Sequence, residues 1–265
     1  MSSTSPLNPA PSIGAQNAFN AANNLVALSL QRQSTGLRIN RGADDPAGLI
    51  SSEQLQAQLA ALEAETRAAD RASAVAATAD AALSTVSDQL AEAKALAVAN
   101  ANTGGMSEAE IEANQMQAES ILQSIDRQLS NASFNDVKLF DGGVRLSARG
   151  ETYDVPQTSL NTLGLGGVNF ANTDELSSAV DTATNRVNTI RGDLGAFQKN
   201  VIDALKRNTQ VEFENISSAN SIIRDTDFAA ESAFFARASV LGATSGTALQ
   251  FTNSQPATAL NLITG

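Results

Sequence analysis

This chain of 265 residues contains no cysteine, no histidine and no tryptophan, and each absence excludes a class of chemistry. A chain without cysteine forms no disulfide and performs no thiol reaction. A chain without histidine lacks the most common general base and metal ligand of proteins. We therefore expect no catalytic residues, no cofactor and no metal site, and an enzyme is the weakest interpretation of the composition.

Aromatic side chains are scarce, with ten Phe and one Tyr in a chain dominated by Ala and Leu. A compact core usually contains more large aromatic side chains. Long helices packed side by side need fewer of them, because Ala and Leu suffice where the helices meet. The composition therefore favours helices over sheets.

Charged side chains are missing from both ends of the chain. Residues 1–31 and 238–265 contain no Asp, Glu, Lys or Arg, so every charged side chain lies between Arg32 and Arg237. The ends of soluble monomers normally lie on the surface and carry charge. Uncharged ends that are rich in apolar and amide side chains indicate segments that become buried against other chains. This pattern favours a subunit of a polymer.

The net charge of −11 comes without a basic patch, so neither nucleic acid nor an anionic membrane surface is an expected partner. No run approaches the ~18 apolar residues of a membrane span. The first 31 residues do not have the pattern of a signal peptide. We expect no membrane span and no small-molecule substrate, and any export must use a route that does not read such a signal.

A seven-residue repeat predicts a long helix from about residue 45 to 100. Positions 55, 62, 69, 76, 83, 90 and 97 are all Leu or Ala, and positions 72, 79, 86 and 93 are Ala or Val. This repeat is typical of a coiled-coil seam. The helix would be about 84 Å long at about 1.5 Å per residue. Its larger seam residues are Leu55, Leu62, Leu83, Val86 and Leu90.

A second long helix is expected from about residue 174 to 223, where apolar residues recur at intervals of three and four. Its seam residues are Val180, Val187, Ile190, Leu194, Phe197 and Val201. A shorter helix is expected over about 107–131, and turn signals predict a small β-hairpin region over about 134–172. The predicted fold is mainly α, a long antiparallel helical rod with coiled-coil-like packing, with paired N- and C-terminal helices.

Two neighbouring carboxylates, Asp44 and Asp45, precede Pro46 and could in principle bind a metal or act in catalysis. Aspartate caps free backbone N–H groups at a helix start, and proline is favoured at the first helical position. Helix capping is the simpler interpretation of this pair.

Two segments resemble the signature sequences of bacterial flagellins. The first comprises residues 33–40, Gln-Ser-Thr-Gly-Leu-Arg-Ile-Asn, and residues 44–49, Asp-Asp-Pro-Ala-Gly-Leu; the second is residues 214–231. The residues that carry the likeness are Gly36, Leu37, Arg38, Asn40, Asp44, Asp45, Asn220, Arg224, Asp225, Asp227 and Phe228. The resemblance spans nearly the whole chain from about residue 13 and implies a short flagellin without large variable outer domains.

The resemblance implies two domains. Residues 1–44 and 226–265 would form an inner pair of terminal helices that lines the channel of a filament, and residues 45–225 would form an outer rod domain. The apolar residues expected to carry assembly are Ile13, Leu25, Leu28, Phe228, Phe234, Phe235, Leu241, Leu249, Phe251, Leu260 and Leu262.

The resemblance also implies partners and a location. Flagellins are exported unfolded by the flagellar type III apparatus, fold at the distal tip and form the extracellular filament used for swimming. The implied partners are further flagellin copies, the cap protein, the hook–filament junction proteins and an export chaperone. We call the two uncharged segments, residues 1–31 and 238–265, the arms. We also expect these arms to be disordered in the monomer and to fold on assembly.

Two alternative functions remain open on the sequence. The hook–filament junction protein has similar terminal segments, and its copy number in purified filaments would distinguish it from a flagellin. A coiled-coil adhesin or binding module would explain the heptads, but it would not explain the uncharged ends.

The segment containing Leu90, Glu92 and Lys94 is similar to the part of flagellins that the animal Toll-like flagellin receptor recognises. Relatives that this receptor recognises carry Arg where Glu92 stands. Because a charge reversal at a recognition point is usually costly, we expect weak receptor activation. A reporter-cell assay checks this, and potency equal to that of an enteric flagellin would contradict it.

Overall fold

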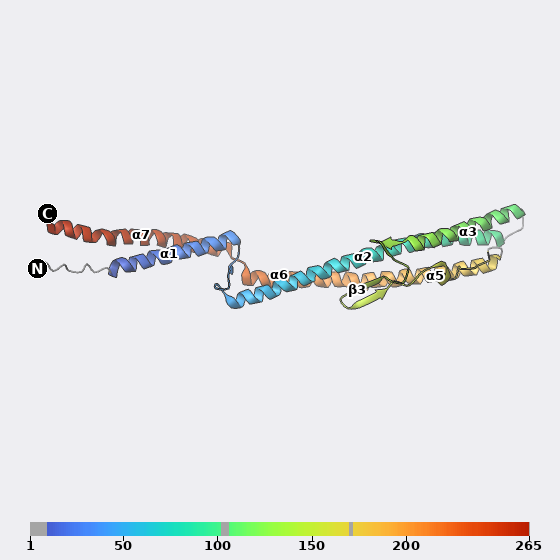
Figure 1. Ribbon diagram of the computed structural model, residues 1–265, viewed down its shortest axis with the longest axis horizontal. Coiled ribbons are helices and arrows are strands. Elements are labelled where there is room, and N and C mark those ends of the chain that lie inside the picture. Colours follow the sequence, from blue (N-terminus) through green and yellow to red (C-terminus); the bar gives the residue numbers. More distant parts are fainter. Residues whose placement is uncertain (1–9, 102–105, 170–171, 265) are drawn as a thin grey trace. The chain divides into compact units, whose positions relative to one another are not determined.

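The computed structural model describes residues 10–101, 106–169 and 172–264, which are predominantly helical (Figure 1). Two compact units divide the chain, one comprising Met1–Leu59 with Glu214–Gly265 and the other Ala60–Phe213. Both divisions fall inside long helices, α2 (Pro46–Ala101) and α6 (Asp203–Arg224). They therefore differ from the expected boundaries at residues 44/45 and 225/226.

The first unit is built around two terminal helices, α1 (Ala10–Thr35) and α7 (Phe228–Thr264). The two helices pack side by side (Figure 1). They are antiparallel, because Ser29 of α1 contacts the backbone of Glu231, whereas Phe19 lies beside Gly246. The expected pairing of the N- and C-terminal helices is confirmed.

The second unit contains most of α2, together with α3 (Glu108–Asn131), α5 (Thr173–Phe197) and the start of α6. Two small antiparallel sheets follow α3. In the first, β1 (Ser133–Phe134) pairs with β2 (Val137–Lys138), and in the second, β3 (Arg145–Ala148) pairs with β4 (Glu151–Asp154). A one-turn helix, α4 (Leu160–Leu163), precedes α5. The mainly α fold with a small hairpin region agrees with the sequence prediction.

The start of α3 shows how local sequence fixes a helix end. Ser107 accepts a hydrogen bond from the Glu110 N–H, while the Glu110 carboxylate accepts one from the Ser107 N–H at 2.7 Å. This reciprocal pair satisfies two backbone donors that have no partner inside the helix. The same hydrogen bonds lower the pKa of Glu110.

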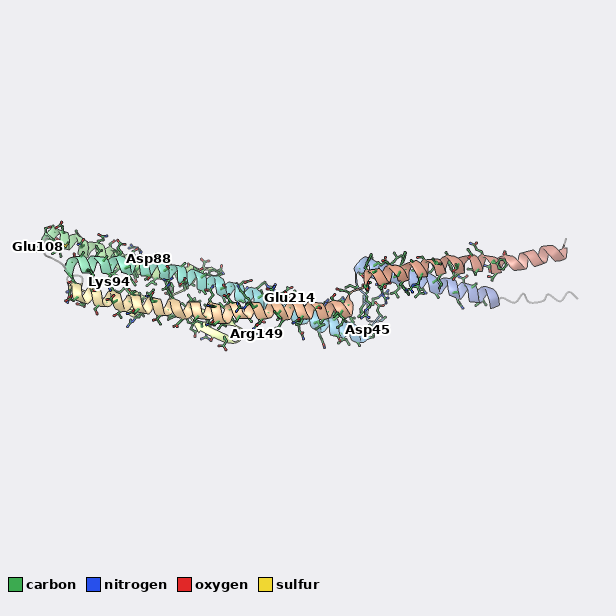
Figure 2. All side chains as sticks on the ribbon, turned by 180° about the vertical axis from the view of Figure 1, so that it is seen from behind. Asp45, Asp88, Lys94, Glu108, Arg149 and Glu214 are labelled. Carbon is green, nitrogen blue, oxygen red and sulfur yellow. The ribbon has the colours of Figure 1, made fainter. Side chains whose placement is uncertain are left out.

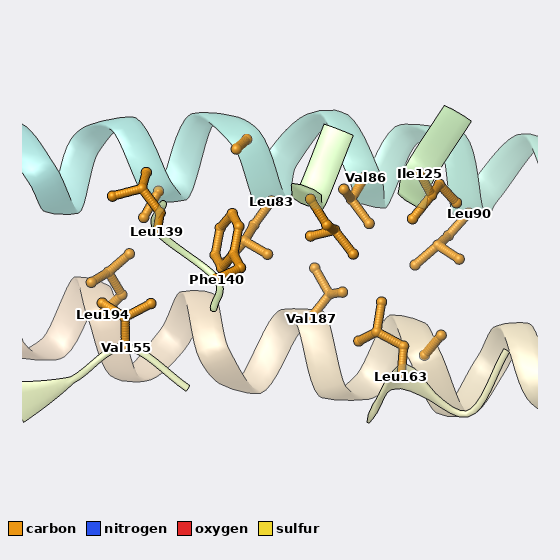
Figure 3. Close-up of a cluster of buried hydrophobic side chains, with 14 of the residues drawn as sticks. Leu83, Val86, Leu90, Ile125, Leu139, Phe140, Val155, Leu163, Val187 and Leu194 are labelled. Carbon is orange, nitrogen blue, oxygen red and sulfur yellow. The ribbon is translucent and has the colours of Figure 1, made fainter. Parts of the chain in front are cut away.

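The heptad residues of α2 form the core of the second unit. Positions 69, 76, 83, 90 and 97 are all buried, as are positions 72, 79, 86 and 93. They meet Ile125 and its neighbours on α3, Val187 and Leu194 on α5, and Leu139 and Phe140 from the segment after β2 (Figure 3). Most of the predicted seam residues are buried, namely Leu62, Leu83, Val86, Leu90, Val180, Val187, Leu194 and Phe197. The other three are partly buried, namely Leu55, Ile190 and Val201. Alanine at six of the nine buried heptad positions lets the helices approach closely.

The hairpin of β3 and β4 joins α2 to α5 and α6. Arg149, in the turn of this hairpin, binds Glu65 of α2 at 3.2 Å and Glu212 of α6 at 2.7 Å (Figure 2). The Arg149 guanidinium lowers the pKa of Glu212 through these contacts. Tyr153 of β4 stacks on Phe197, with the ring centroids 5.6 Å apart.

A single π-turn, η1 (Gln198–Ile202), interrupts the helix between α5 and α6. The Asp203 N–H donates to the Gln198 carbonyl, so one extra residue is accommodated in this turn. The buried residues here are Leu194, Phe197 and Ile202, so the spacing between successive buried residues is first three and then five. The predicted seam ended at Val201, which is half-buried and packs against the core, and the π-turn places Ile202, Leu205 and Thr209 in the interior beyond it.

We expect deletion of Lys199 to leave the second unit as stable as in the parent chain. Lys199 is exposed, and removing one residue converts the π-turn to regular α-helix while Ile202 and Leu205 keep their places in the core. Deletion of the exposed Asn188 is the matched control, because it shifts Leu194 and Phe197 out of the core and costs about 2–5 kcal/mol for each large side chain displaced. Urea unfolding followed by far-UV circular dichroism measures both. Equal destabilisation by the two deletions would contradict the register argument.

Candidate assembly surface

Small side chains line the contact between α1 and α7. Ala22, Ser29 and Ala238 are fully or almost fully buried there. A Cβ atom on Gly242 would lie 3.9 Å from the Ala22 Cβ, and one on Gly246 would lie only 3.3 Å from the Phe19 ring. The two helix backbones therefore approach closely, and glycine permits this approach. Burying these small residues leaves most of the large apolar side chains outside the contact.

The large apolar side chains of the pair point outward. Seven of them are exposed by 37% to 64% of their surface, namely Ile13, Leu25, Leu30, Phe228, Val240, Leu241 and Phe251. Charge is absent from the same helices before Arg32 and after Arg237. A soluble monomer rarely exposes so much apolar surface without a partner. The arrangement can bury these side chains only against another molecule.

The residues expected to carry assembly fall into three groups. Ile13, Leu25, Phe228, Leu241 and Phe251 are exposed, and Leu28, Phe234, Phe235 and Leu249 are half-buried. Leu260 and Leu262 belong to α7, but their side chains lie outside the described part. Sequence reasoning missed Leu30 and Val240 and the small-residue contact. The three- and four-residue spacing of Phe19, Ala22, Val26 and Ser29 was the signal that could have found this contact.

A polar cluster ends the contact between α1 and α7 where charge first appears. Arg32 lies 3.7 Å from the Glu231 carboxylate, and both side chains are largely buried, being 25% and 11% exposed. Ser29 and Gln33 each donate a hydrogen bond to the Glu231 carbonyl at 3.4 Å. Because the rest of the contact is made of small apolar residues, this cluster fixes which residues of the two helices face each other.

The signature residues bring together two segments that are far apart in the sequence. Leu37 forms an antiparallel bridge with Asp225. The Arg38 N–H donates to the Arg224 carbonyl at 2.7 Å, and the Thr226 N–H donates to the Gly36 carbonyl at 2.9 Å. Gly36 ends α1 with a φ of +70°, which only glycine adopts at little cost. The Arg38 side chain adds a hydrogen bond to the Ile223 carbonyl at 2.7 Å.

Asp44 and Asp45 bind backbone N–H groups. The Asp44 carboxylate accepts from the N–H groups of Asn40 at 3.0 Å and Arg41 at 2.9 Å, and these bonds lower its pKa. Asp45 accepts from the Gly48 N–H at 2.9 Å, as an N-cap of α2 does. The stabilisation from Asp44 is present while its carboxylate is ionised and is lost as the pH falls through the lowered pKa.

The remaining signature residues hold the start of α2, the end of α6 and the start of α7. Ser52 is fully buried and donates to the Asn220 side chain at 2.7 Å, and Arg224 lies 3.3 Å from the Glu53 carboxylate. Asp227 accepts from the N–H groups of Ala229 and Ala230 and so caps α7. Its neighbour Phe228 is exposed. Most of the signature residues therefore shape the region from which the two arms leave.

The three residues of the expected receptor segment lie in the second unit and are not equally accessible. Leu90 is fully buried in the core, so its side chain is not available on the folded unit. Glu92 is exposed and accepts a hydrogen bond from Gln117 of α3 at 3.3 Å. Lys94, labelled in Figure 2, forms an ion pair with Asp181 of α5. Of the three residues, only Glu92 is exposed, whereas Lys94 is half-buried.

Neither a metal site nor a membrane span is found among the described residues. No three acidic side chains there are gathered closely enough to hold a metal ion. No helix within the described ranges combines the length and the apolar character that crossing a bilayer requires.

The chain is similar to known proteins over nearly its whole length. It is 29% identical to the flagellin of Halalkalibacterium halodurans over 248 residues, which are 89% of this chain and 90% of that protein. It is 28% identical to the flagellar filament 30.7 kDa core protein of Treponema maltophilum, covering 91% of this chain and 93% of that protein. The fold also resembles that of a putative flagellar hook-associated protein from Vibrio parahaemolyticus, with a TM-score of 0.55 and 17% identity over 67% of this chain and 99% of that one.

Two family patterns cover most of the sequence in the expected order. The bacterial flagellin N-terminal helical region matches residues 8–144. The bacterial flagellin C-terminal helical region matches residues 177–263. The first includes α1, α2, α3 and the β1–β2 hairpin, and the second includes most of α5 and nearly all of α7. The chain belongs to the bacterial flagellins.

Proposed function

We propose that this chain is a structural subunit that polymerises into a flagellar filament through the outward faces of α1 and α7. The observation that carries the proposal is the exposure of seven large apolar side chains on a helix pair whose arms carry no charge. Relatives named as flagellins and filament core proteins support the same function. The residues proposed to make the contacts are those of the terminal helices α1 and α7, including Leu28, Phe234, Phe235, Leu249, Leu260 and Leu262.

The exposed apolar area is large enough to drive assembly. A fully buried Val, Leu, Ile or Phe contributes about 1.5–3 kcal/mol. Seven such side chains that are about half exposed in the monomer would contribute roughly 5–10 kcal/mol when neighbouring copies cover them. Association entropy and side-chain ordering oppose this gain. A subunit that touches several copies at once offsets these costs better than one that touches a single partner.

The roles that we propose for the two domains follow those of flagellins. The terminal pair, residues 1–44 and 226–265, would line the filament channel, and residues 45–225 would form the outer rod. The chain would leave the cell unfolded through the flagellar type III apparatus and serve swimming from an extracellular filament. Its further partners would be the cap, the hook–filament junction proteins and an export chaperone. The absence of cysteine suits passage through a narrow channel, because no disulfide can lock a partly folded state.

The hook–filament junction protein is the nearest alternative. Such a protein would also expose apolar terminal helices, since it contacts the end of the same polymer. The two functions would differ in the copy number of this chain in purified filaments. The flagellin relatives that match about 90% of this chain favour the filament subunit.

Replacement of Val240 and Leu241 by Asn tests the assembly surface. Both side chains are more than half exposed, so the change should leave the fold of the monomer intact. We expect the critical monomer concentration for seeded filament growth to rise at least about ten-fold, because each factor of ten corresponds to about 1.4 kcal/mol. Sedimentation of filaments measures it. Val211→Asn is the matched control, since Val211 is 57% exposed but lies on the part of α6 that belongs to the second unit. An equal effect of the control and the double change would refute the proposed surface.

Hydrogen exchange tests whether the arms fold on assembly. We expect backbone N–H groups of residues 13–31 to exchange rapidly in the monomer and slowly in the filament, because the α1–α7 contact alone buries few large side chains. The heptad part of α2 serves as the internal control and should be protected in both states. Strong and equal protection of residues 13–31 in monomer and filament would contradict the expectation.

A further inference from the structure

An apolar groove of about 410 Å³ lies on the second unit between α2 and the small strands. Ala72 and Val75 of α2 form one wall, and Phe134, Val144 and Leu146 form the other. Val137, at the groove edge, is 54% exposed. No described side chain fills the groove, although its walls are predominantly apolar. Such a surface gains free energy when an apolar side chain of another molecule enters it.

The rim of this groove carries a positive charge that is not neutralised. Arg71 of α2 is exposed and has no carboxylate within 4.0 Å among the described residues. The other rim cation, Arg145, is already bound to Asp154 at 2.6 Å. The occupant of the groove should therefore combine an apolar side chain with a nearby negative charge.

The outward face of α3 has this combination. Met116 is 60% exposed, and Glu112 and Glu119 lie four residues before it and three residues after it. Residues at these spacings share one face of a helix. Neither glutamate has a cation within ion-pair distance in the described part of the chain. Met116 is also well suited to an irregular groove, because its unbranched side chain adapts to the space available.

Met116 and the groove cannot meet within one molecule. The opposite face of α3, with Ala118, Leu122 and Ile125, packs into the core. Gln117 contacts Glu92 of α2 at 3.3 Å, whereas the groove begins near Ala72. The twenty residues between these points on α2 correspond to about 30 Å of helix. The occupant must come from a second copy of the chain.

We propose that Met116 of one copy enters the groove of the next copy, with Glu112 and Glu119 beside Arg71. This inference rests on the proposed filament function and adds a contact between the second units of neighbouring subunits. The two surfaces are different patches of one molecule, so each bound copy presents a free patch to a further copy. Such a heterologous contact does not close a dimer, and it propagates into a helical polymer.

Cysteine cross-linking tests the contact in a chain that has no cysteine of its own. Filaments of the double variant Met116→Cys, Val137→Cys are oxidised and analysed on a denaturing non-reducing gel. We expect a ladder of covalent multimers, because each copy would be joined to its neighbours on both sides. The control variant Met116→Cys, Val211→Cys has a second cysteine at a similarly exposed position outside the groove and should give no ladder.

The outcomes distinguish a failure of the proposed contact from a failure of the proposed filament function. Filaments that give no ladder would overturn the contact between Met116 and the groove while leaving the filament function intact. Failure of the unmodified chain to form filaments would overturn the proposed function. A ladder of equal intensity in the control variant would show non-specific oxidation and would also overturn the contact.

Charge reversal provides a second measurement that does not depend on cysteine. We expect Arg71→Glu to raise the critical concentration for filament growth about three- to ten-fold, because it places like charges side by side. Adding Glu112→Lys and Glu119→Lys to the same chain should restore growth. Arg207→Glu, which reverses an exposed cation on α6 outside the groove, is the control. An equal effect of Arg71→Glu and Arg207→Glu, or no recovery in the triple variant, would contradict the proposal.

Discussion

Close packing of small side chains between helices determines what each unit leaves exposed. In the second unit, alanines at the heptad positions of α2 bring α3 and α5 close enough for Leu83, Leu90 and Val187 to fill the core. In the first unit, Ala22, Ala238 and Gly242 bring α1 and α7 together, and none of the described large apolar side chains of the pair is fully buried. The second unit thus buries its large side chains within one chain. The first leaves seven large apolar side chains exposed, and we propose that these contact neighbouring subunits.

The arms are held at their base by polar contacts. Backbone hydrogen bonds connect Gly36 and Arg38 with residues 224–226, and Arg32 lies against Glu231 where the uncharged helices begin. These polar groups require defined partners and geometry, whereas the small apolar contact beyond them would tolerate a shift of one helix along the other. The family signature therefore marks the place where direction and register of the two terminal helices are set, and we propose that the apolar surface beyond it supplies the affinity for neighbouring copies.

Most of the helical architecture could be predicted from the sequence, because apolar period and capping are local signals. The heptads of α2, the Ser107–Glu110 cap and the seam of α5 up to Phe197 needed no tertiary information. The π-turn could not be foreseen, since Val201 and Ile202 are both apolar and only packing against α2 selects Ile202. The sequence also assigned Leu90 both to the receptor segment and to the heptad seam. The structure shows that Leu90 is buried in the seam. The small-residue contact of the arms was missed because alanine and glycine give weak periodic signals.

The hydrogen bonds between residues 36–38 and residues 223–226 have a consequence for the order in which the chain folds. Arg38 and Ile223 are separated by 185 residues, so their hydrogen bond closes a loop of most of the polypeptide. Closing so long a loop in a flexible chain is entropically unfavourable, and the cost falls when the intervening helices have already paired. We therefore expect the helices of the second unit to pair first, which shortens the distance over which the two terminal segments must search for each other. In that order the contact between residues 36–38 and 223–226 would be among the last that a folding chain makes.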